Sequence, residues 1–155
     1  MKKYEQDGVL TLDDLVLPSD KQLEKGVAFI ECVQEIPCNP CVDACPFGAI
    51  SMKDINAPPI VDYDKCTACG QCVGICPGLA IFVIKVVDDK VLITLPYEFY
   101  PVPEVGDSVQ ALDRKGETVG VAVVRKIRKK NKTMIITIES SKNLAMEIRN
   151  IRVKK

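Results

Sequence analysis

The 155-residue sequence contains no histidine and no tryptophan, and aromatic residues make up only 5% of it. Without histidine there is no imidazole metal ligand, no Rieske-type iron–sulfur site and no Ser–His–Asp catalytic set. A glycine-rich loop of the kind that binds phosphate groups is also missing. These absences exclude histidine-based hydrolysis and phosphate binding by such a loop.

Long apolar runs are absent as well. No stretch approaches about 18 consecutive apolar residues, so we expect no transmembrane helix. Residues 1–7 are mostly charged or polar and lack the apolar core of a signal peptide. We therefore expect a cytoplasmic protein without a membrane span.

Charge is balanced overall but not along the chain. Residues 1–95 contain eight lysines and fourteen acidic residues, a net charge of −6, whereas residues 96–155 contain thirteen basic and seven acidic residues, a net charge of +6. Such a dipole can orient a partner and raise its association rate. The basic run at residues 125–132 could be a nucleic-acid patch, but a solvated hairpin tip is the simpler interpretation, because single-strand sites generally use aromatic side chains, which are scarce here.

Eight cysteines, all between Cys32 and Cys76, are the most informative feature that is present. Four disulfides would require an oxidising compartment, and no export signal is visible. A zinc site usually takes two Cys-x-x-Cys pairs from separate loops. Here three cysteines and a proline recur at an offset of 31 residues, as Cys38, Cys41, Cys45 and Pro46 and again as Cys69, Cys72, Cys76 and Pro77. Closely spaced thiolates favour iron–sulfur chemistry.

The run from Cys66 to Pro77, Cys-x-x-Cys-x-x-Cys-x-x-x-Cys-Pro, resembles the cluster-binding run of bacterial-type ferredoxins with two [4Fe-4S] clusters. The resemblance covers residues 26–84. It implies that the last cysteine of each run binds the cluster of the other run. The implied ligands are Cys66, Cys69, Cys72 and Cys45 for one cluster, and Cys32, Cys38, Cys41 and Cys76 for the other.

Cys32 departs from this pattern, because a ferredoxin would place the corresponding cysteine at Glu35. We expect Cys32 to be a ligand, since eight cysteines then divide evenly into two groups of four. Two alternatives stay open. Cys32 does not bind iron and stands beside a [3Fe-4S] cluster on the other three cysteines, or it is a structural thiol in the strand that begins at Val27.

Residues beside the cysteines allow two smaller predictions. Small residues suit loops whose backbone N–H groups approach cluster sulfurs, and the candidates are Ala44, Ala68, Gly70 and Gly74. Phe47 and Tyr63 also neighbour cysteines, and we expect both to pack in the core.

The predicted fold class is α+β, a two-cluster ferredoxin fold with a pseudo-two-fold repeat followed by a small C-terminal β-barrel. We expect a lead-in segment at residues 1–25, the ferredoxin domain at 26–90 and the barrel, as an interaction domain, at 91–155. A short helix at 21–25 would begin at Ser19 or Asp20 and end at Gly26. The expected strands are 27–30, 50–52, 59–61, 80–84, 91–95, 108–112, 118–127 and 133–139, with a proline-rich connector at 96–103 and a helix or strand at 144–151.

A wider resemblance concerns the whole chain. Residues 30–41, 76–81 and 95–99 are similar to the small iron–sulfur subunits of flavin-dependent amino-acid dehydrogenase complexes, which resemble proline, hydroxyproline and sarcosine dehydrogenases and hydrogen cyanide synthase. This implies an electron-transfer subunit with no substrate site of its own, in a hetero-oligomer with a flavoprotein dehydrogenase. The alternative is a binding module in which the clusters are structural and the basic barrel binds nucleic acid or a protein.

Overall fold

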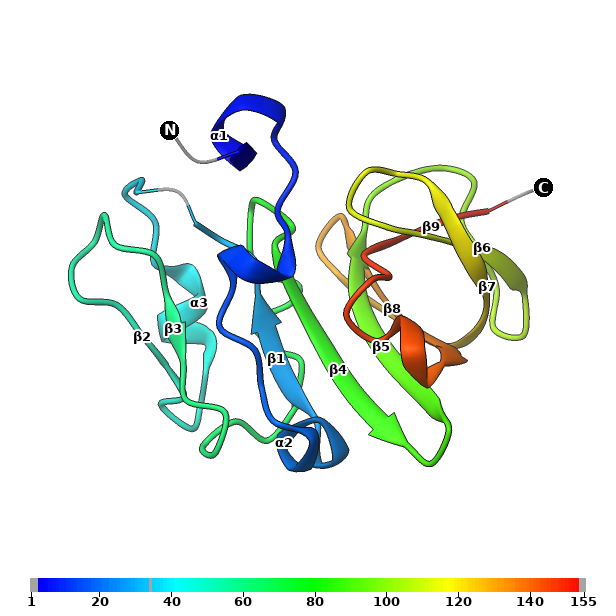
Figure 1. Ribbon diagram of the computed structural model, residues 1–155, viewed down its shortest axis with the longest axis horizontal. Coiled ribbons are helices and arrows are strands. Elements are labelled where there is room, and N and C mark those ends of the chain that lie inside the picture. The colour runs from blue at the N-terminus through cyan, green and yellow to red at the C-terminus, as the bar shows by residue number, and fades with distance from the viewer. Residues whose placement is uncertain (1–2, 34, 154–155) are drawn as a thin grey trace.

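The computed structural model describes residues 3–33 and 35–153 (Figure 1). The helices are α1 (Lys3–Asp7), α2 (Asp20–Lys25) and α3 (Pro40–Ala44), with 3-10 helices η1 (Leu12–Asp14) and η2 (Lys142–Leu144). The strands are β1 (Val27–Ile30), β2 (Ile50–Ser51), β3 (Ile60–Val61), β4 (Ile81–Val87), β5 (Lys90–Tyr97), β6 (Ser108–Leu112), β7 (Thr118–Lys130), β8 (Thr133–Ser141) and β9 (Asn150–Arg152). Within these two ranges, no helix is both long enough and apolar enough to cross a membrane.

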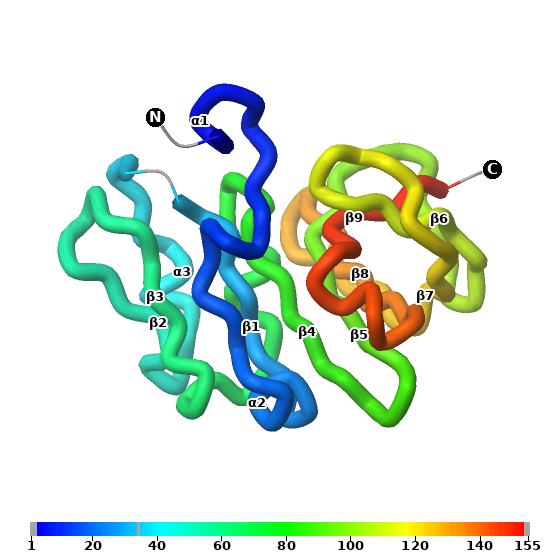
Figure 2. Tube along the Cα trace, in the orientation of Figure 1, coloured from blue at the N-terminus to red at the C-terminus, as the bar shows by residue number. Residues whose placement is uncertain are grey.

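Seven strands form one antiparallel sheet in the order β1-β4-β5-β8-β7-β6-β9, and β2 pairs with β3 in a separate sheet. The small sheet and α3 lie on one side of β1 and β4, and the later strands lie on the other side (Figure 1). The trace from β5 to β9 curls around a common centre (Figure 2). The domain boundary was expected between residues 90 and 91. Strands β4 and β5 meet near this point and pair with each other, so the sheet is continuous through the expected boundary. The boundaries and a closed barrel stay predictions.

The helix expected near residue 21 is confirmed, and its ends have clear causes. The Ser19 hydroxyl accepts a hydrogen bond from the Gln22 backbone N–H at 3.3 Å, and the Gln22 side-chain oxygen accepts one from the Ser19 N–H at 2.9 Å. This reciprocal pair satisfies donors that a helix start leaves open. Gly26 ends the helix with a φ of 93°, where a Cβ would also lie 3.1 Å from the Ala68 Cβ.

The strand predictions are largely confirmed, with two corrections. First, β5 extends through Pro96 and Tyr97, which were expected to belong to a connector. Proline has no N–H to donate to a neighbouring strand, so it is tolerated only where one side of a strand is unpaired. The pairing of β4 with β5 ends at Thr94, which leaves the β4 side of β5 unpaired at Pro96, while β8 pairs with the other side. Second, residues 144–151 form neither a helix nor a full strand, since the 3-10 helix η2 ends at Leu144 and β9 begins only at Asn150.

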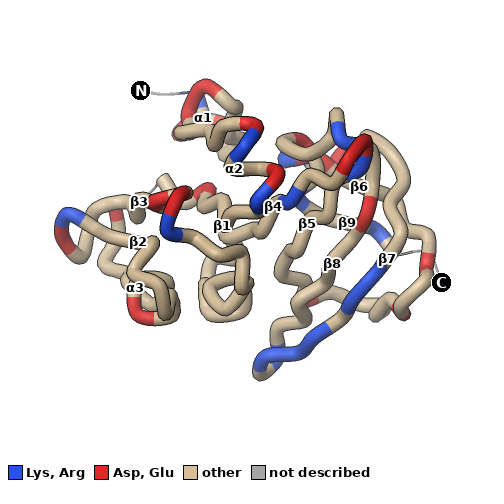
Figure 3. Tube along the Cα trace, turned by 90° about the horizontal axis from the view of Figure 1, so that it is seen from below, with Lys and Arg blue, Asp and Glu red and all other residues tan. Residues whose placement is uncertain are grey.

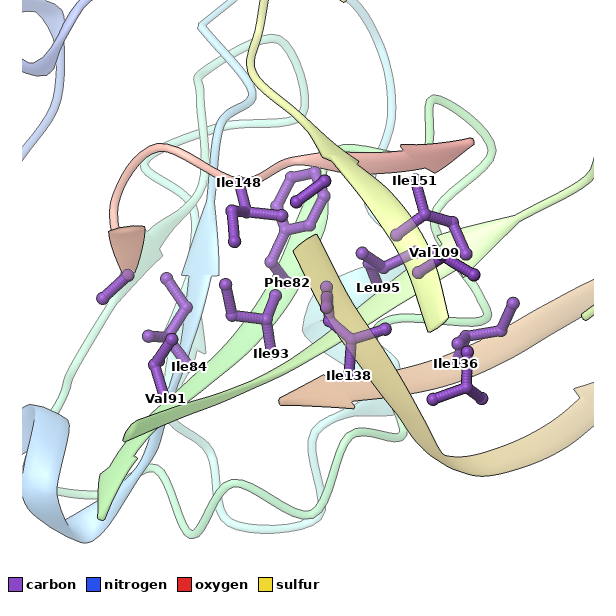
Figure 4. Packing of buried hydrophobic residues seen from close by; sticks show 14 of the residues in the cluster. Phe82, Ile84, Val91, Ile93, Leu95, Val109, Ile136, Ile138, Ile148 and Ile151 are labelled. Atoms are coloured by element: carbon purple, nitrogen blue, oxygen red, sulfur yellow. The ribbon is translucent and has the colours of Figure 1, made fainter. Parts of the chain in front are cut away.

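Strand β4 separates two hydrophobic cores. Ile81 and Val83 belong to the core around the cysteines, whereas Phe82, Ile84 and Val86 belong to the core of the later strands. Successive side chains of a strand point to opposite faces, so a strand buried on both faces reads as a continuous apolar run. In the second core the side chains of β4, β5, β6, β8 and β9 point toward one another (Figure 4).

The lead-in segment packs against the body of the protein through two leucines. Leu15 and Leu23 are partly buried against the core of the later strands, and Leu23 also contacts the cysteine core. The Tyr63 hydroxyl donates a hydrogen bond to the Val16 carbonyl at 2.6 Å. The segment is therefore tied to the region that contains the cysteines.

Candidate iron–sulfur cluster sites

One cavity is lined by cysteines from both runs, and we name it the Cys45 cavity. Cys66, Cys69 and Cys72 come from the loop between β3 and β4, and Cys45 ends helix α3. The other lining residues are Ala28, Phe47, Ala49, Ile50, Thr67 and Gly70. Cys45 therefore faces the second cysteine run, although it follows the first run in sequence.

A second cavity, the Cys76 cavity, repeats this arrangement in reverse. Cys32, Cys38 and Cys41 of the first run line it together with Cys76, the last cysteine of the second run. The remaining lining residues are mostly apolar, namely Ile30, Ile36, Pro40, Ala57, Pro59, Pro77 and Ile81. The two cavities together account for all eight cysteines of the sequence.

Crowding of the sulfur atoms disfavours their charged forms. Burial raises the pKa of the Cys72 thiol, repulsion from Cys66, Cys69 and, least, Cys45 adds to the shift, and together they bring this pKa to about 12. Burial likewise raises the pKa of Cys41, and Cys76 adds to the shift. A cationic iron core would offset this repulsion, because thiolates are the form that binds metal.

Backbone N–H groups donate hydrogen bonds to cysteine sulfurs, among them those of Cys45, Cys66 and Cys76. The Ala49 N–H donates to Cys45 Sγ at 3.3 Å, and the Ala80 N–H donates to Cys76 Sγ at 3.5 Å. In both cases the donor lies four residues after the cysteine. The Ala28 N–H of β1 donates to Cys66 Sγ at 3.2 Å. Hydrogen bonds of this kind stabilise thiolate charge and help to set the potential of an iron–sulfur cluster.

The small residues next to the cysteines were expected to bring N–H groups to the sulfurs of a bound cluster, and this stays a prediction. Its residues are Ala44, Ala68, Gly70 and Gly74, and the donors Ala28, Ala49 and Ala80 add to them. The sequence did contain the relevant pattern, because Ala49 and Ala80 are related by the same 31-residue offset as the cysteines.

The donor sets suit iron–sulfur clusters. Each cavity has four thiol side chains on its walls and an otherwise largely apolar lining. In the part of the chain that the structure describes, no three Cys, Asp or Glu side chains converge closely enough to share one metal ion. Four soft thiolate donors around a cavity are the ligands of a cubane cluster.

Comparison with known proteins agrees with this geometry. Residues 31–81 match the family model of the 4Fe-4S dicluster domain. The chain contains a 4Fe-4S ferredoxin domain. Its family match ends where β4 begins, so the strands from β5 onward lie outside the matched segment. No solved structure matches the chain significantly.

Curated proteins resemble the ferredoxin domain over short segments. One subunit of an ion-translocating oxidoreductase complex from Methanosarcina acetivorans is 46% identical over 57 residues, which cover 37% of this chain and 20% of that protein. The polyferredoxin-like subunit of an aliphatic sulfonate oxidoreductase from Pyrococcus furiosus is 47% identical over 47 residues, covering 30% of this chain and 27% of that protein. Ferredoxin-type protein NapF from Haemophilus influenzae is 37% identical over 68 residues, covering 42% of this chain and 38% of that protein. The chain thus spans less than half the length of these relatives.

The cysteines of the Cys45 cavity differ in their exposure to solvent. Cys69 is exposed, whereas Cys66 and Cys72 are buried. Phe47, which lines the same cavity, is 50% exposed, so the expectation that it packs in the core is wrong. Its neighbour Cys45 ends α3, and Phe47 lies in the turn that follows. The Cys45 cavity therefore has an edge, at Cys69, that a partner can approach.

The ferredoxin domain also contacts the β7–β8 hairpin, a contact that sequence reasoning missed. A Cβ at Gly70 would lie 3.1 Å from Arg128 Nη2, and one at Gly74 would lie 2.8 Å from Ile135 Cδ1 and 3.1 Å from Lys130 Cδ. A φ of 79° favours glycine at position 70, and the Ile135 and Lys130 side chains leave little room for a Cβ at position 74. The expectation of a solvated hairpin tip agrees with the exposure of Arg128, Lys129 and Lys132, but it did not include this contact with the cysteine loop.

Proposed function

We propose that this chain is an electron-transfer protein that binds two [4Fe-4S] clusters, one in each cavity. The ligands would be Cys45, Cys66, Cys69 and Cys72 in the Cys45 cavity, and Cys32, Cys38, Cys41 and Cys76 in the Cys76 cavity. The observation that carries the proposal is the exchange of Cys45 and Cys76 between the two cysteine runs. A two-cluster ferredoxin uses its proline-flanked cysteines in this way.

When bound, each cluster would accept and release one electron at a time. The protein contributes the surroundings that set the potential. The N–H groups of Ala28, Ala49 and Ala80 stabilise sulfur charge, and the apolar linings limit solvent access. A chain with these features relays electrons and needs no substrate site of its own.

The finer proposal is that the electrons come from a flavoprotein that oxidises an amino acid. A reduced flavin holds two electrons, and two clusters could remove them one by one. The similarity of residues 30–41, 76–81 and 95–99 to the small subunits of such complexes supports this partner. The relatives named as subunits of oxidoreductase complexes support a hetero-oligomer.

Anaerobic purification tests the function directly. We expect a brown protein with about eight irons per chain, a visible absorption that dithionite bleaches reversibly, and electron paramagnetic resonance of two clusters after reduction. A colourless protein that contains zinc, or no metal, would contradict the proposal. Isolation from the native host should recover a partner that contains flavin, and a co-purifying redox partner without flavin would contradict the finer proposal only.

Cys32 has its own test. Cys32→Ser should lower the iron content by about one to four irons, and a three-iron cluster that remained would be recognisable by its paramagnetism in the oxidised state. An unchanged iron content and unchanged spectrum would remove Cys32 from the ligand set and leave the other seven cysteines in place.

A further inference from the structure

Unpaired cations are concentrated on the β7–β8 hairpin. Of its six Lys and Arg residues between positions 125 and 132, only Arg125 forms an ion pair within the described residues, with Glu139. The five others are Lys126, Arg128, Lys129, Lys130 and Lys132. Basic residues follow one another along β7 toward the end of the hairpin (Figure 3). Holding so many like charges together costs free energy unless a partner neutralises them.

The cations adjoin the exposed edge of the Cys45 cavity. Arg128 Nη2 approaches Gly70 to within 3.1 Å of where a Cβ would be, and Gly70 follows Cys69 directly. Cys69 is exposed. A protein that binds the hairpin would therefore lie next to the edge through which electrons can enter or leave.

Two exposed aromatic residues lie at the same end of the sheet. Tyr97, the last residue of β5, pairs with Met134 at the start of β8, and the Thr133 hydroxyl donates to the Glu98 carboxylate at 2.5 Å. The next residues, Phe99 and Tyr100, are 56% and 89% exposed. Aromatic residues and arginine are enriched at protein–protein interfaces and supply much of their binding energy.

We propose that the hairpin surface, formed by Lys126, Arg128, Lys129, Lys132, Phe99 and Tyr100, docks an acidic face of a redox partner protein beside Cys69. The inference rests on the proposed function. Complementary charge would steer the partner and raise its association rate.

A partner with a local acidic face fits the charge distribution better than a nucleic acid does. The first 95 residues have a net charge of −6, and each oxidised cluster with four thiolates would add about −2. A long polyanion that extended beyond the hairpin would be repelled by this half of the protein. A compact acidic patch around a cofactor would contact the cations only.

The test uses the cluster-loaded full chain, after iron analysis and dithionite bleaching have shown reducible clusters. Stopped-flow mixing of the reduced protein with oxidised flavodoxin, an acidic acceptor, gives the second-order rate of electron transfer. The triple variant Lys126→Glu/Lys129→Glu/Lys132→Glu should lower this rate at low ionic strength by at least about tenfold. The difference should vanish at high ionic strength, where the charges are screened.

A matched control changes the net charge equally elsewhere. Lys53, Lys90 and Lys115 are exposed and lie outside the hairpin, so Lys53→Glu/Lys90→Glu/Lys115→Glu should leave the rate close to that of the wild type. Equal slowing by both triple variants, or none by either, would overturn the docking surface while the clusters and their function stand. So would a hairpin variant that loses binding to a single-stranded oligonucleotide but transfers electrons at the normal rate. Absence of reducible clusters would instead reject the proposed function.

Discussion

Glu31 accepts a hydrogen bond from the guanidinium of Arg149, although 118 positions of sequence separate the two residues. Arg114 donates to the other oxygen of the same carboxylate. Only 7% of the Glu31 side chain and 5% of the Arg149 side chain are exposed. Arg149 also lies over the rings of Phe29 and Phe82, at 5.6 and 5.2 Å from their centroids. The network joins the end of β1, just before Cys32, to the C-terminal strands.

Removing the single carboxylate from this network should be costly. Burial lowers the pKa of Arg149 to about 10 while Glu31 opposes the shift, so the guanidinium is charged at neutral pH. Glu31→Gln would leave two buried guanidinium groups without a counter-charge, and we expect a loss of about 3–5 kcal/mol in the free energy of unfolding. Urea denaturation of the wild type and the variant measures this.

The exposed ion pair between Arg125 and Glu139 provides the control. Their side chains are 55% and 25% exposed. Glu139→Gln should cost no more than about 1 kcal/mol, because water already screens this pair. Similar losses in the free energy of unfolding for Glu31→Gln and Glu139→Gln would contradict the prediction that burial makes the Glu31 network the more costly one to break.

The exchange of cysteines between runs predicts an unusual pattern of iron loss. Cys45→Ser and Cys69→Ser should each remove about four irons, and the double variant should lose no more than either single variant, because both act on one cluster. Cys45→Ser combined with Cys41→Ser should remove nearly all iron, although the two cysteines are only four positions apart. Iron analysis of anaerobically prepared variants provides the test. If Cys45 and Cys41 served the same cluster, the second pair would lose about four irons.

Contact between the hairpin and the cysteine loop makes Gly74 sensitive to substitution. Gly74→Ala would place its Cβ 2.8 Å from Ile135 Cδ1 and 3.2 Å from Lys130 Cβ. We expect a loss of about 1–3 kcal/mol from overpacking, and faster release of iron. Gly78→Ala is the control, because no atom lies within 4 Å of a Cβ there. Urea midpoints and iron retention compare the two, and equal values would refute close packing at position 74.

The raised pKa of Tyr63 predicts that the free energy of unfolding depends on pH in the alkaline range. Burial, with a smaller effect of Cys66, raises its pKa from 10.0 to about 12. The folded protein therefore favours the neutral phenol, and this contribution to stability is fully present below pH 10 and is lost as pH rises to about 12. Tyr63→Phe should remove this component and, at neutral pH, the hydrogen bond to Val16, at a cost of about 1 kcal/mol.

Urea unfolding at neutral and alkaline pH measures the effect of Tyr63. Tyr100→Phe is a suitable control because that side chain is 89% exposed. An alkaline loss of stability that is identical in the wild type and in Tyr63→Phe would exclude Tyr63 as its source.

Local patterns in the sequence were sufficient for much of the fold. Ser19 and Gly26 mark the ends of a short helix because capping depends on neighbouring backbone groups only. Runs of β-branched residues predicted β6 with its bounds and most of β7 and β8. The end of β5 was missed, because whether Pro96 can belong to a strand depends on where its neighbour β4 stops pairing.

By itself, the sequence determined the chemistry of the ferredoxin domain, because cysteine spacing and its 31-residue repeat are properties of the chain alone. Only the tertiary structure decided that Arg128 lies beside Gly70 and that Arg149 meets Glu31. Such contacts join residues far apart in sequence, and no local propensity or period encodes which distant side chain fills a given space. They arise when the packing of the sheet brings its later strands against the cysteine loop and the end of β1.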